Sequence, residues 1–399
     1  MMLRVLSPIH IGNGNKLTPV DLYPTGNMVY VLDVEKLVNN LQKLGVDLEE
    51  ILALLKNPPG EHYIWKGYIE EYHLDPADYA LYSLPVFGGT GKTSMQIDEF
   101  IKLNGKPYIP GSSLKGAVRT AVFYKALREC GDSGTTMNLV SGFSGNLARD
   151  IGYSKSLIDY YIEYLDREVS RNRKFDRKRT DDLLEAIIFG MERGRYPGVR
   201  YEPKRDPMRG LIIRDSQSMG RKHLAVYHVS IVGNTSDEMK TWVEALQPGT
   251  ETEVELKFDD ELLKMNAGYF NGLLWECLKD RGKPWEVFEG FVWEAVREFY
   301  GAIIDHELRN LSKFGGHGST VRSFYEGLRG KERILRLGWG SGWISTTVGL
   351  LLVEKGWKWE TVRKKLKLGE NPKTKRLSRD FPKTRRLTDG IPIGWVVLQ

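Results

Sequence analysis

The sequence predicts an α+β protein made of two modules, and three observations support this prediction. The chain has 399 residues, more than one hydrophobic core usually supports, so two domains are expected. Apolar residues make up 41% and charged residues 28%, the composition of a packed globular protein with a charged surface. Stretches with strand-like alternation and stretches with helical spacing follow one another in both halves of the chain.

We place the first module at residues 1–232 and the second at residues 233–399. The expected junction is the turn at 233–237, Gly-Asn-Thr-Ser-Asp. The first module is expected to carry helical insertions at about 34–75 and 131–205. The second is expected to carry a glycine-rich loop and a basic tail. The two modules share a layout but no sequence repeat.

In the first module, residues 2–6 and 28–32 predict strands, separated by a tight loop at 7–14 that contains Pro and Gly. Residues 34–44 and 48–55 have helical spacing and end at Asn-Pro-Pro. Residues 114–129 predict a helix with Ser112 and Ser113 as its N-cap. We expect a loop at 131–152, because it is rich in Gly, Ser and Asn, then helix at 153–189 and a strand at 223–232.

The second module begins with an alternating strand at 250–258. Long helices are predicted at 261–278 and 285–310, then a strand at 333–337 that runs into the glycine-rich loop. A helix at 344–354 follows. From residue 355 onward we expect a basic tail punctuated by proline.

The placement of charge indicates a polyanion surface better than the net charge of +6 does. Residues 355–386 hold thirteen Lys or Arg and three acidic residues. Such a stripe is typical of a surface that binds a polyanion, with a solvated tail as the alternative. A second basic run, at 171–179, is partly neutralised by the acidic residues that follow it, so it can equally be a solvated helix.

Only two cysteines occur, Cys130 and Cys277. They are far apart in the sequence and have no Cys or His neighbours at ligand spacing. We therefore expect neither a disulfide framework nor a zinc site, and we expect a reducing, cytoplasmic environment. No apolar run reaches the roughly 18 residues of a membrane helix, and no signal peptide is recognisable.

Two motifs could bind phosphate. Residues 88–93, Gly-Gly-Thr-Gly-Lys-Thr, end like a nucleotide-binding loop, but Val86 occupies the place of its first glycine, so a polar turn is the preferred interpretation. Residues 108–120 place Gly111, Ser112 and Ser113 before a helix that carries Lys115 and Arg119 on one face. They can form an anion site, or simply a capped helix with a solvated basic face.

The most distinctive run is Leu-Gly-Trp-Gly-Ser-Gly-Trp at 337–343. Three glycines allow positive φ angles and let backbone N–H groups approach a ligand, which suits a sugar-phosphate backbone. The dinucleotide fingerprint is absent, because Trp343 stands where its third glycine belongs. We expect Trp339 and Trp343 to brace the loop against the core, with base stacking as the alternative. Residues 315–318, Gly-Gly-His-Gly, precede Arg322 and are a hinge or a second contact point.

Candidate catalytic and metal-binding groups are few. The seven histidines are scattered without metal-ligand spacing, and no serine-hydrolase elbow occurs, so neither a metal nor a cofactor is expected. His10, beside Gly12 and Gly14, could act as an acid or base on RNA, but a structural histidine is the preferred interpretation.

Several of these motifs together resemble the RAMP superfamily of CRISPR effector proteins. They are residues 7–12, the block at 109–116, Asp-Pro-Met-Arg at 206–209 and Arg-Asp-Ser at 214–216. The glycine-rich loop with Arg336, the run at 381–386, Phe-Pro-Lys-Thr-Arg-Arg, and the ending at 392–396, Pro-Ile-Gly-Trp-Val, are similar to the family of fifth Csm-type subunits of the type III-A interference complex. The resemblance spans almost the whole chain except 131–205.

The resemblance implies two ferredoxin-like modules, related to RRM domains, with helical insertions. It implies a non-catalytic subunit that caps the 3′ end of the CRISPR RNA (crRNA) and supports its maturation. The implied partners are crRNA, the neighbouring backbone RAMP subunit, the small helical subunit and cellular nucleases, with no membrane. The residues expected to contact RNA are His10, Gly12, Gly14, Gly111, Ser112, Ser113, Lys115, Arg119, Arg322, Gly338, Gly340, Ser341, Gly342, Lys383, Arg385 and Arg386.

Two alternatives remain open. The chain could be a ribonuclease like its backbone sibling in the family, with Asp21 as the nearest candidate, although residues 18–23 match the sibling's loop poorly and a structural Asp21 is expected. It could also be an assembly adaptor that never touches RNA.

Overall fold

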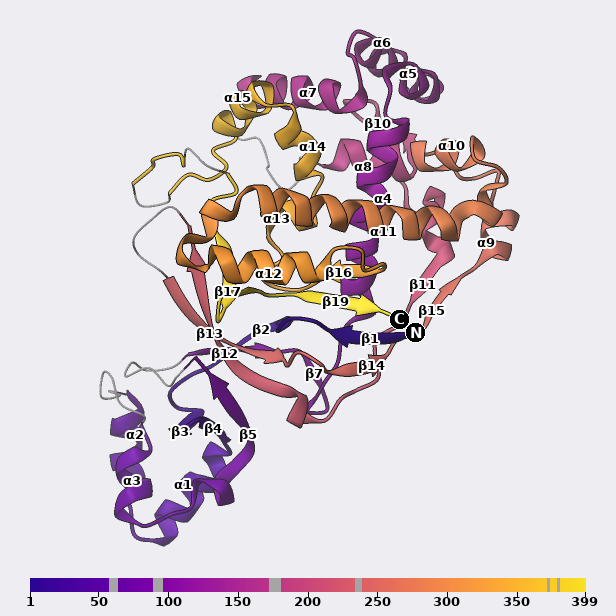
Figure 1. The fold of residues 1–399 in the computed structure, drawn as a ribbon. Helices are drawn as coiled ribbons and strands as arrows, with labels where there is room; N and C mark the ends of the chain where they lie inside the picture. The colour runs from indigo at the N-terminus through magenta and orange to yellow at the C-terminus, as the bar shows by residue number, and fades with distance from the viewer. Residues whose placement is uncertain (57–63, 89–95, 172–180, 234–238, 372–373, 379–380) are drawn as a thin grey trace.

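The fold combines two larger β-sheets with helices, as the predicted α+β class requires (Figure 1). The computed structural model describes residues 1–399 except 57–63, 89–95, 172–180, 234–238, 372–373 and 379–380. Within these described residues, no helix has both the length and the apolar character that crossing a membrane requires.

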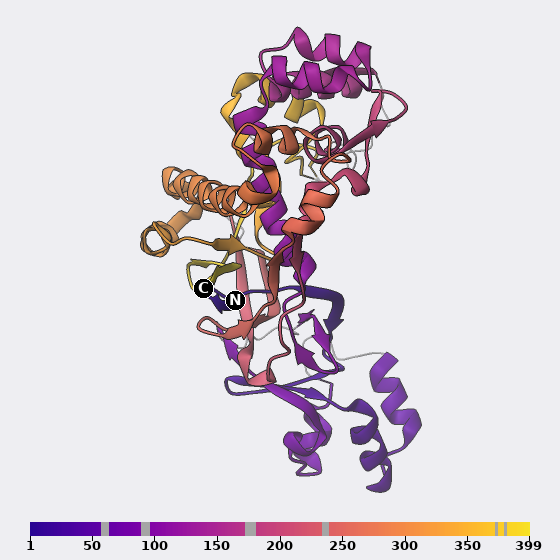
Figure 2. The same ribbon diagram turned by 90° about the vertical axis from the view of Figure 1, so that its right-hand side faces the viewer.

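A four-stranded antiparallel sheet joins the two ends of the chain. Its order is β14–β1–β19–β16. The strands are β1 (Met2–Val5), β14 (Glu251–Glu253), β16 (Ile334–Arg336) and β19 (Trp395–Leu398). β1 and β16 confirm two predicted strands, but the expected basic tail ends in β19, an inner strand. The Met2 amide donates to the Gln399 carbonyl oxygen at 3.0 Å, so the termini are adjacent (Figures 1 and 2).

The larger, mixed sheet has the order β2–β6–β13–β12–β5–β4–β3, and β17 pairs with β12 and β18. Its strands are β2 (Gly12–Leu17), β3 (Leu22–Thr25), β4 (Met28–Leu32), β5 (Ala80–Phe87), β6 (Ile97–Phe100), β12 (Leu224–Val232), β13 (Met239–Leu246), β17 (Arg385–Thr388) and β18 (Ile391–Pro392). β4 and β12 confirm predictions, whereas Gly12 and Gly14 lie in a strand and not in a loop. β12 and β13 pair from Leu224 to Ile231, so the expected boundary at 232/233 falls inside a hairpin.

Long helices cover the four-stranded sheet (Figure 1). They are α4 (Gly111–Cys130), α11 (Pro284–Arg309) and α12 (Gly318–Leu328). α11 confirms the predicted helix at 285–310. The Trp395 ring of β19 is fully buried, 6.0 Å from the Tyr300 ring and 5.8 Å from the Tyr325 ring. Burying a large aromatic side chain makes a large contribution to stability, so Trp395 anchors β19 against α11 and α12.

The first insertion forms a lobe with its own apolar cluster. Its helices, as predicted, are α1 (Val34–Lys43) and α2 (Leu48–Lys56), followed by α3 (Lys66–Glu71). Leu37, Leu41, Ile51 and Trp65 are buried together, and the Trp65 indole N–H donates to the Val20 carbonyl oxygen at 2.7 Å. The lobe lies at the end of the molecule opposite to the second insertion (Figures 1 and 2).

The second insertion corrects the prediction of a loop at 131–152. It contains α5 (Ser133–Ser141), α6 (Gly145–Gly152), α7 (Leu157–Arg171), α8 (Asp182–Phe189) and the hairpin β9 (Met191–Arg193) and β10 (Val199–Tyr201). The Asp132 carboxylate accepts the Thr135 amide at 2.8 Å, and the Ser144 hydroxyl accepts the Leu147 amide at 3.3 Å. The polar residues that suggested a loop are therefore N-caps of short helices.

Three predicted elements are each divided in two. The predicted strand at 250–258 becomes β14 and β15 (Leu256–Phe258), and β15 pairs with β11 (Leu211–Ile213). The helix at 261–278 becomes α9 (Asp260–Met265) and α10 (Leu273–Lys279), and the helix at 344–354 becomes α13 (Gly342–Thr346) and α14 (Gly349–Glu354). The region expected to be a basic tail contains a helix, α15 (Trp357–Lys365). Elsewhere, two strands of two residues each, β7 (Lys102–Leu103) and β8 (Lys106–Pro107), form a small hairpin. Apolar periodicity survives a bend, so it does not reveal where an element breaks.

The expectation that the two cysteines form no disulfide is wrong, because Cys130 and Cys277 are bonded to each other. They are 147 residues apart in sequence, yet α10 packs on α4 and brings their Cα atoms to 5.9 Å. Their distance in the sequence therefore said nothing about their distance in the fold.

Removing this crosslink should lower the free energy of unfolding by about 2–5 kcal/mol, because the disulfide restricts the unfolded chain. The loss of unfolding free energy should be equal in Cys130→Ala, Cys277→Ala and the double variant, since each removes the same bond. Denaturant unfolding with and without dithiothreitol measures the effect. A wild-type protein that is insensitive to the reductant would contradict the prediction.

Candidate nucleic-acid interface

The glycine-rich loop at 337–343 connects β16 to α13, and its three glycines have the positive φ angles expected of them. The angles are 73° at Gly338, 104° at Gly340 and 78° at Gly342. L-residues with a side chain rarely adopt such angles. The sequence prediction of a glycine-dependent loop is confirmed.

Gly338 also allows a close approach of two backbones. The Trp339 amide donates to the His10 carbonyl oxygen at 2.8 Å, and a Cβ on Gly338 would overlap that same oxygen. The segment before β19 contacts both of these segments. The Leu337 amide donates to the Gly394 carbonyl oxygen at 2.7 Å, and the Gly394 amide donates to the Pro8 carbonyl oxygen at 2.9 Å. Two segments, one from each end of the chain, thus meet at the loop.

The other two loop glycines differ in their surroundings. A Cβ on Gly340 would lie 2.6 Å from the Ile393 side chain, whereas a Cβ on Gly342 would meet nothing within 4 Å. Gly342 is exposed and Gly340 is buried. The loop is therefore packed at one end and open to solvent at the other.

Three arginines surround a small cavity beneath the loop, of about 20 Å³. Arg336 donates to the carbonyl oxygens of Ile393 and Gly340, both at 3.2 Å. The Arg385 Nε lies 2.9 Å from both carboxylate oxygens of Glu307. The Arg386 guanidinium lies over the Trp339 ring, 4.2 Å from its centre. Among the described residues that line this cavity, Glu307 is the one carboxylate.

Some donors around this cavity are unsatisfied within the described part of the chain. Arg385 Nη2 and Arg386 Nε are buried without a hydrogen-bond partner there. Burial, with a further contribution from the positive charge of Arg336, lowers the pKa of Arg386. A site with three guanidinium groups, one carboxylate and unpaired N–H groups favours an anion, and its volume admits about one oxygen atom.

Both tryptophans of the loop are braced, in agreement with the sequence analysis. The Trp343 ring stacks on Trp359 at 5.8 Å with an interplanar angle of 8°, and meets Phe381 edge-on at 4.8 Å. Trp339 packs between Arg386 and His10. Their rings therefore hold the loop in place.

His10 is buried, so a direct contact of its side chain with RNA stays an untested prediction. Its side chain is 3% exposed, and Nδ1 lies 2.7 Å from the Glu244 carbonyl oxygen. Burial lowers its pKa below the usual value. His10 thus lies beneath the surface, while Gly12 and Gly14 are exposed beside it in β2.

The expected anion site at the start of α4 is already occupied by the protein's own groups. The helix begins at Gly111, whose amide donates to the Asp215 carboxylate at 2.8 Å, so Ser112 and Ser113 are not its cap. Lys115 donates to the Leu211 carbonyl oxygen at 2.7 Å, and burial lowers its pKa.

Arg119, one turn further along α4, is bound to acidic side chains. It pairs with Glu185 at 2.7 Å and also with Asp206. Its positive charge is thus compensated within the fold. A contact of this block with RNA stays a prediction.

The remaining candidates are spread over the surface. Arg322 is exposed on α12, 3.7 Å from Glu326. Gly315 has a φ of 56° within a 3₁₀ segment (Leu311–His317). Lys383 is half-buried beside the arginine cavity. Residues 89–93 of the nucleotide-loop-like motif, 172–179 of the second basic run and 234–237 of the expected junction lie outside the described residues.

The sequence did not predict a role in the site for Glu307 or Glu244, and it placed Arg336 only within a family motif. Glu244 is fully buried and accepts bonds from Tyr82 at 2.8 Å and Lys102 at 2.5 Å. One feature of the sequence could have identified Arg336 as a site residue, because it is a cation inside an otherwise apolar strand. No feature of the sequence could have identified Glu307 or Glu244, because only tertiary packing buries them. In the described part of the chain, no group of three His, Cys, Asp or Glu side chains is placed to hold a metal ion.

The Arg385–Glu307 pair provides a direct test of the cavity's construction. Both side chains are almost fully buried, at 6% and 3% exposure. Arg385→Met should lower the free energy of unfolding by about 3–5 kcal/mol, because it leaves a buried carboxylate unpaired. Adding Glu307→Leu to this variant should recover most of the lost free energy of unfolding, because no buried charge is then left unpaired. Denaturant unfolding of both single variants and the double variant gives the coupling, and strictly additive losses would contradict a buried pair.

Comparisons with known proteins agree with this architecture. The sequence matches the profile of the RAMP superfamily over residues 2–345. A crystal structure of T. onnurineus Csm5 is 59% identical, with a TM-score of 0.86, and each chain is covered completely. A chain in the cryo-EM structure of a Csm–crRNA–target RNA ternary complex of a type III-A CRISPR-Cas system is 60% identical. Its TM-score is 0.88, and the match covers 100% of this chain and 99% of that one.

Two more distant relatives match over shorter segments. The Csm5 proteins of Methanocaldococcus jannaschii and Streptococcus thermophilus are each 29% identical, over 123 and 129 residues. These matches span 29% and 36% of the length of those proteins. The chain belongs to the RAMP superfamily and, within it, to the Csm5 family.

Proposed function

We propose that this chain is a non-catalytic RNA-binding subunit of a type III-A CRISPR ribonucleoprotein, where it caps the 3′ end of crRNA and supports its maturation. The observation that carries the proposal is the arginine cavity beneath the glycine-rich loop, with its unpaired, buried N–H groups. A phosphate oxygen has the charge and the size that such a cavity accepts. The exposed Gly342 end of the loop leaves room for the rest of the backbone.

The structural relative at 60% identity supports the choice of partner, since it was solved within a Csm–crRNA–target RNA complex. Because the similarity extends along the whole chain, we expect this protein, too, to lie beside a neighbouring backbone subunit. Contacts made by backbone N–H groups and arginines do not depend on base identity. That suits an RNA whose spacer sequence varies.

Local geometry supports a structural Asp21. Its carboxylate accepts both the backbone N–H and the hydroxyl of Thr18 at 2.8 Å, so it caps a turn. His10, the other candidate for chemistry on RNA, is buried beneath the loop. The favoured function is therefore to hold RNA in place.

The salt dependence of RNA binding tests the cation assignment. Arg386→Gln and Lys383→Gln should each weaken binding and lower the slope of log K against log salt by about 0.7, the value for one phosphate of a single strand. Arg385, which is already paired with Glu307, should contribute no slope of its own. Lys283→Gln, at an exposed pair with Glu286, is the matched control and should leave the slope unchanged.

The position on the RNA is tested within the assembled complex. A crRNA with a photoreactive 3′-terminal nucleotide should crosslink to this subunit, and one with a photoreactive 5′ end should not. Unchanged slopes in both variants together with no 3′ crosslink would favour an assembly adaptor and overturn the proposal.

A further inference from the structure

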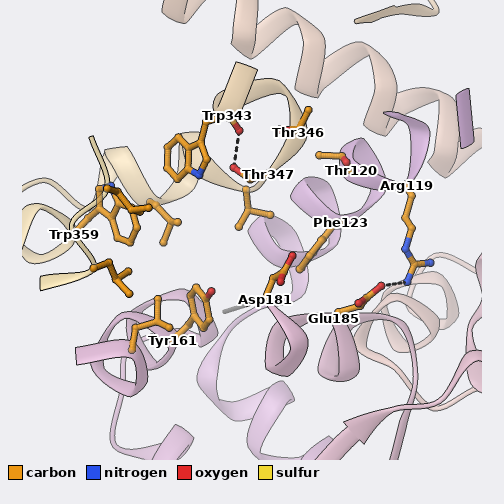
Figure 3. A pocket seen from close by; sticks show the side chains of 15 residues that line it. Arg119, Thr120, Phe123, Tyr161, Asp181, Glu185, Trp343, Thr346, Thr347 and Trp359 are labelled. Atoms are coloured by element: carbon orange, nitrogen blue, oxygen red, sulfur yellow. Dashed lines mark hydrogen bonds and ion pairs between the residues drawn. The ribbon is translucent and has the colours of Figure 1, made fainter. Parts of the chain in front are cut away.

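A second and larger cavity, of about 410 Å³, is lined in part by Trp343, which also lines the arginine cavity (Figure 3). This volume is within the range of small-molecule sites, roughly 300–1,000 Å³. Residues from α4, α7, α8, α13, α14 and α15 line it, and Trp343 lines both cavities. The two sites therefore share one wall.

Aromatic side chains form much of this second cavity. Phe123 comes from α4, Tyr161 from α7 and Trp359 from α15, and Trp343 faces them from α13 (Figure 3). The Trp359 side chain is 3% exposed, and its indole N–H has no hydrogen-bond partner among the described residues. Aromatic walls with an unused donor favour a flat, polar-edged ring over a plain apolar side chain.

The charge of the second cavity is opposite to that of the first. Asp181 and Glu185 line it, and Arg119, the one arginine among the described lining residues, pairs with Glu185 and Asp206. Among the described residues, the Asp181 carboxylate makes no ion pair with a cation. Burial, with a smaller contribution from Asp182, raises the pKa of Asp181. This cavity disfavours a phosphate but can accept a hydrogen bond from an amino group.

The two cavities together match the two ends of a nucleotide. A phosphate near the loop and Arg386 would leave the attached base on the Trp343 side, where the aromatic walls lie. A neutral base suits the acidic cavity, whereas the phosphate suits the arginine cavity. Single-stranded RNA is commonly recognised through such unstacked bases held against aromatic side chains.

We propose that the cavity between Trp343, Phe123, Tyr161 and Asp181 binds one unstacked base of the bound RNA, whose exocyclic amino group donates to the Asp181 carboxylate. The inference rests on the proposed function, because the phosphate of that nucleotide lies at the glycine-rich loop. Adenine and cytosine carry a suitable amino group and uracil does not, so uracil is the disfavoured base.

The test uses short single-stranded RNAs that are identical except for one abasic nucleotide, moved stepwise along the 3′ segment. Fluorescence anisotropy with the full-length protein should show a loss of about tenfold at one position, within the range for one stacked base. Uracil at that position should bind more weakly than adenine or cytosine.

Two variants connect this effect to the cavity. Thr346→Trp places a ring in the cavity, so it should weaken binding of the intact RNA about tenfold and remove the sensitivity to the abasic site. Thr361→Trp is the matched control: Thr361 is also exposed and bonds a carbonyl four residues earlier, but does not line the cavity, so binding should be unchanged. Asp181→Asn should abolish the discrimination against uracil. Thermal unfolding checks that each variant is folded.

The outcomes separate this inference from the proposed function. If the wild-type protein binds RNA with the expected salt slope but no abasic position matters, the base site is wrong and the proposed function stands. If the protein does not bind RNA at all, the proposed function fails first. Adenosine 5′-monophosphate binding that Thr346→Trp blocks, without any abasic effect, would assign the cavity to a free nucleotide and overturn the inference.

Discussion

The contact on which the site depends is the backbone approach at Gly338. The loop amide at Trp339 bonds to the His10 carbonyl oxygen at a separation that leaves no space for a Cβ on Gly338. His10 itself is held by the Glu244 carbonyl oxygen in β13. This contact connects the loop directly to the N-terminal segment and, through His10, to the larger sheet.

The four-stranded sheet explains why both ends of the chain are needed. β1 and β19 pair as neighbours, and Trp395 fills the space beneath α11 and α12. Arg336 comes from β16 of this sheet, whereas Arg385 and Arg386 come from β17, which pairs with β12 of the larger sheet, so both sheets build the arginine cavity. One buried carboxylate, Glu307, balances Arg385. The excess of positive charge that remains among the described residues favours an anion in the cavity.

Local sequence patterns were sufficient to predict the elements with strong periodicity, such as β4, β12 and α11, and the glycine-rich loop. They failed where the deciding partner is distant in sequence. The buried ion pair between Arg385 and Glu307 could not be predicted, because nothing near Arg385 in the sequence points to Glu307. The disulfide joins residues 147 positions apart, and only the packing of α10 on α4 brings them together. The short helices α5 and α6 were missed because their capping residues have the composition of a loop.

The most direct test of this account compares Gly338→Ala with Gly342→Ala. Both glycines have positive φ angles, so both variants carry the cost of a side chain in that conformation, about 1–2 kcal/mol. Only at Gly338 does the new Cβ overlap a backbone atom. We expect the free energy of unfolding, measured in denaturant, to fall at least about 2 kcal/mol further in Gly338→Ala, with a parallel loss of RNA affinity. Equal losses in the two variants would contradict the account.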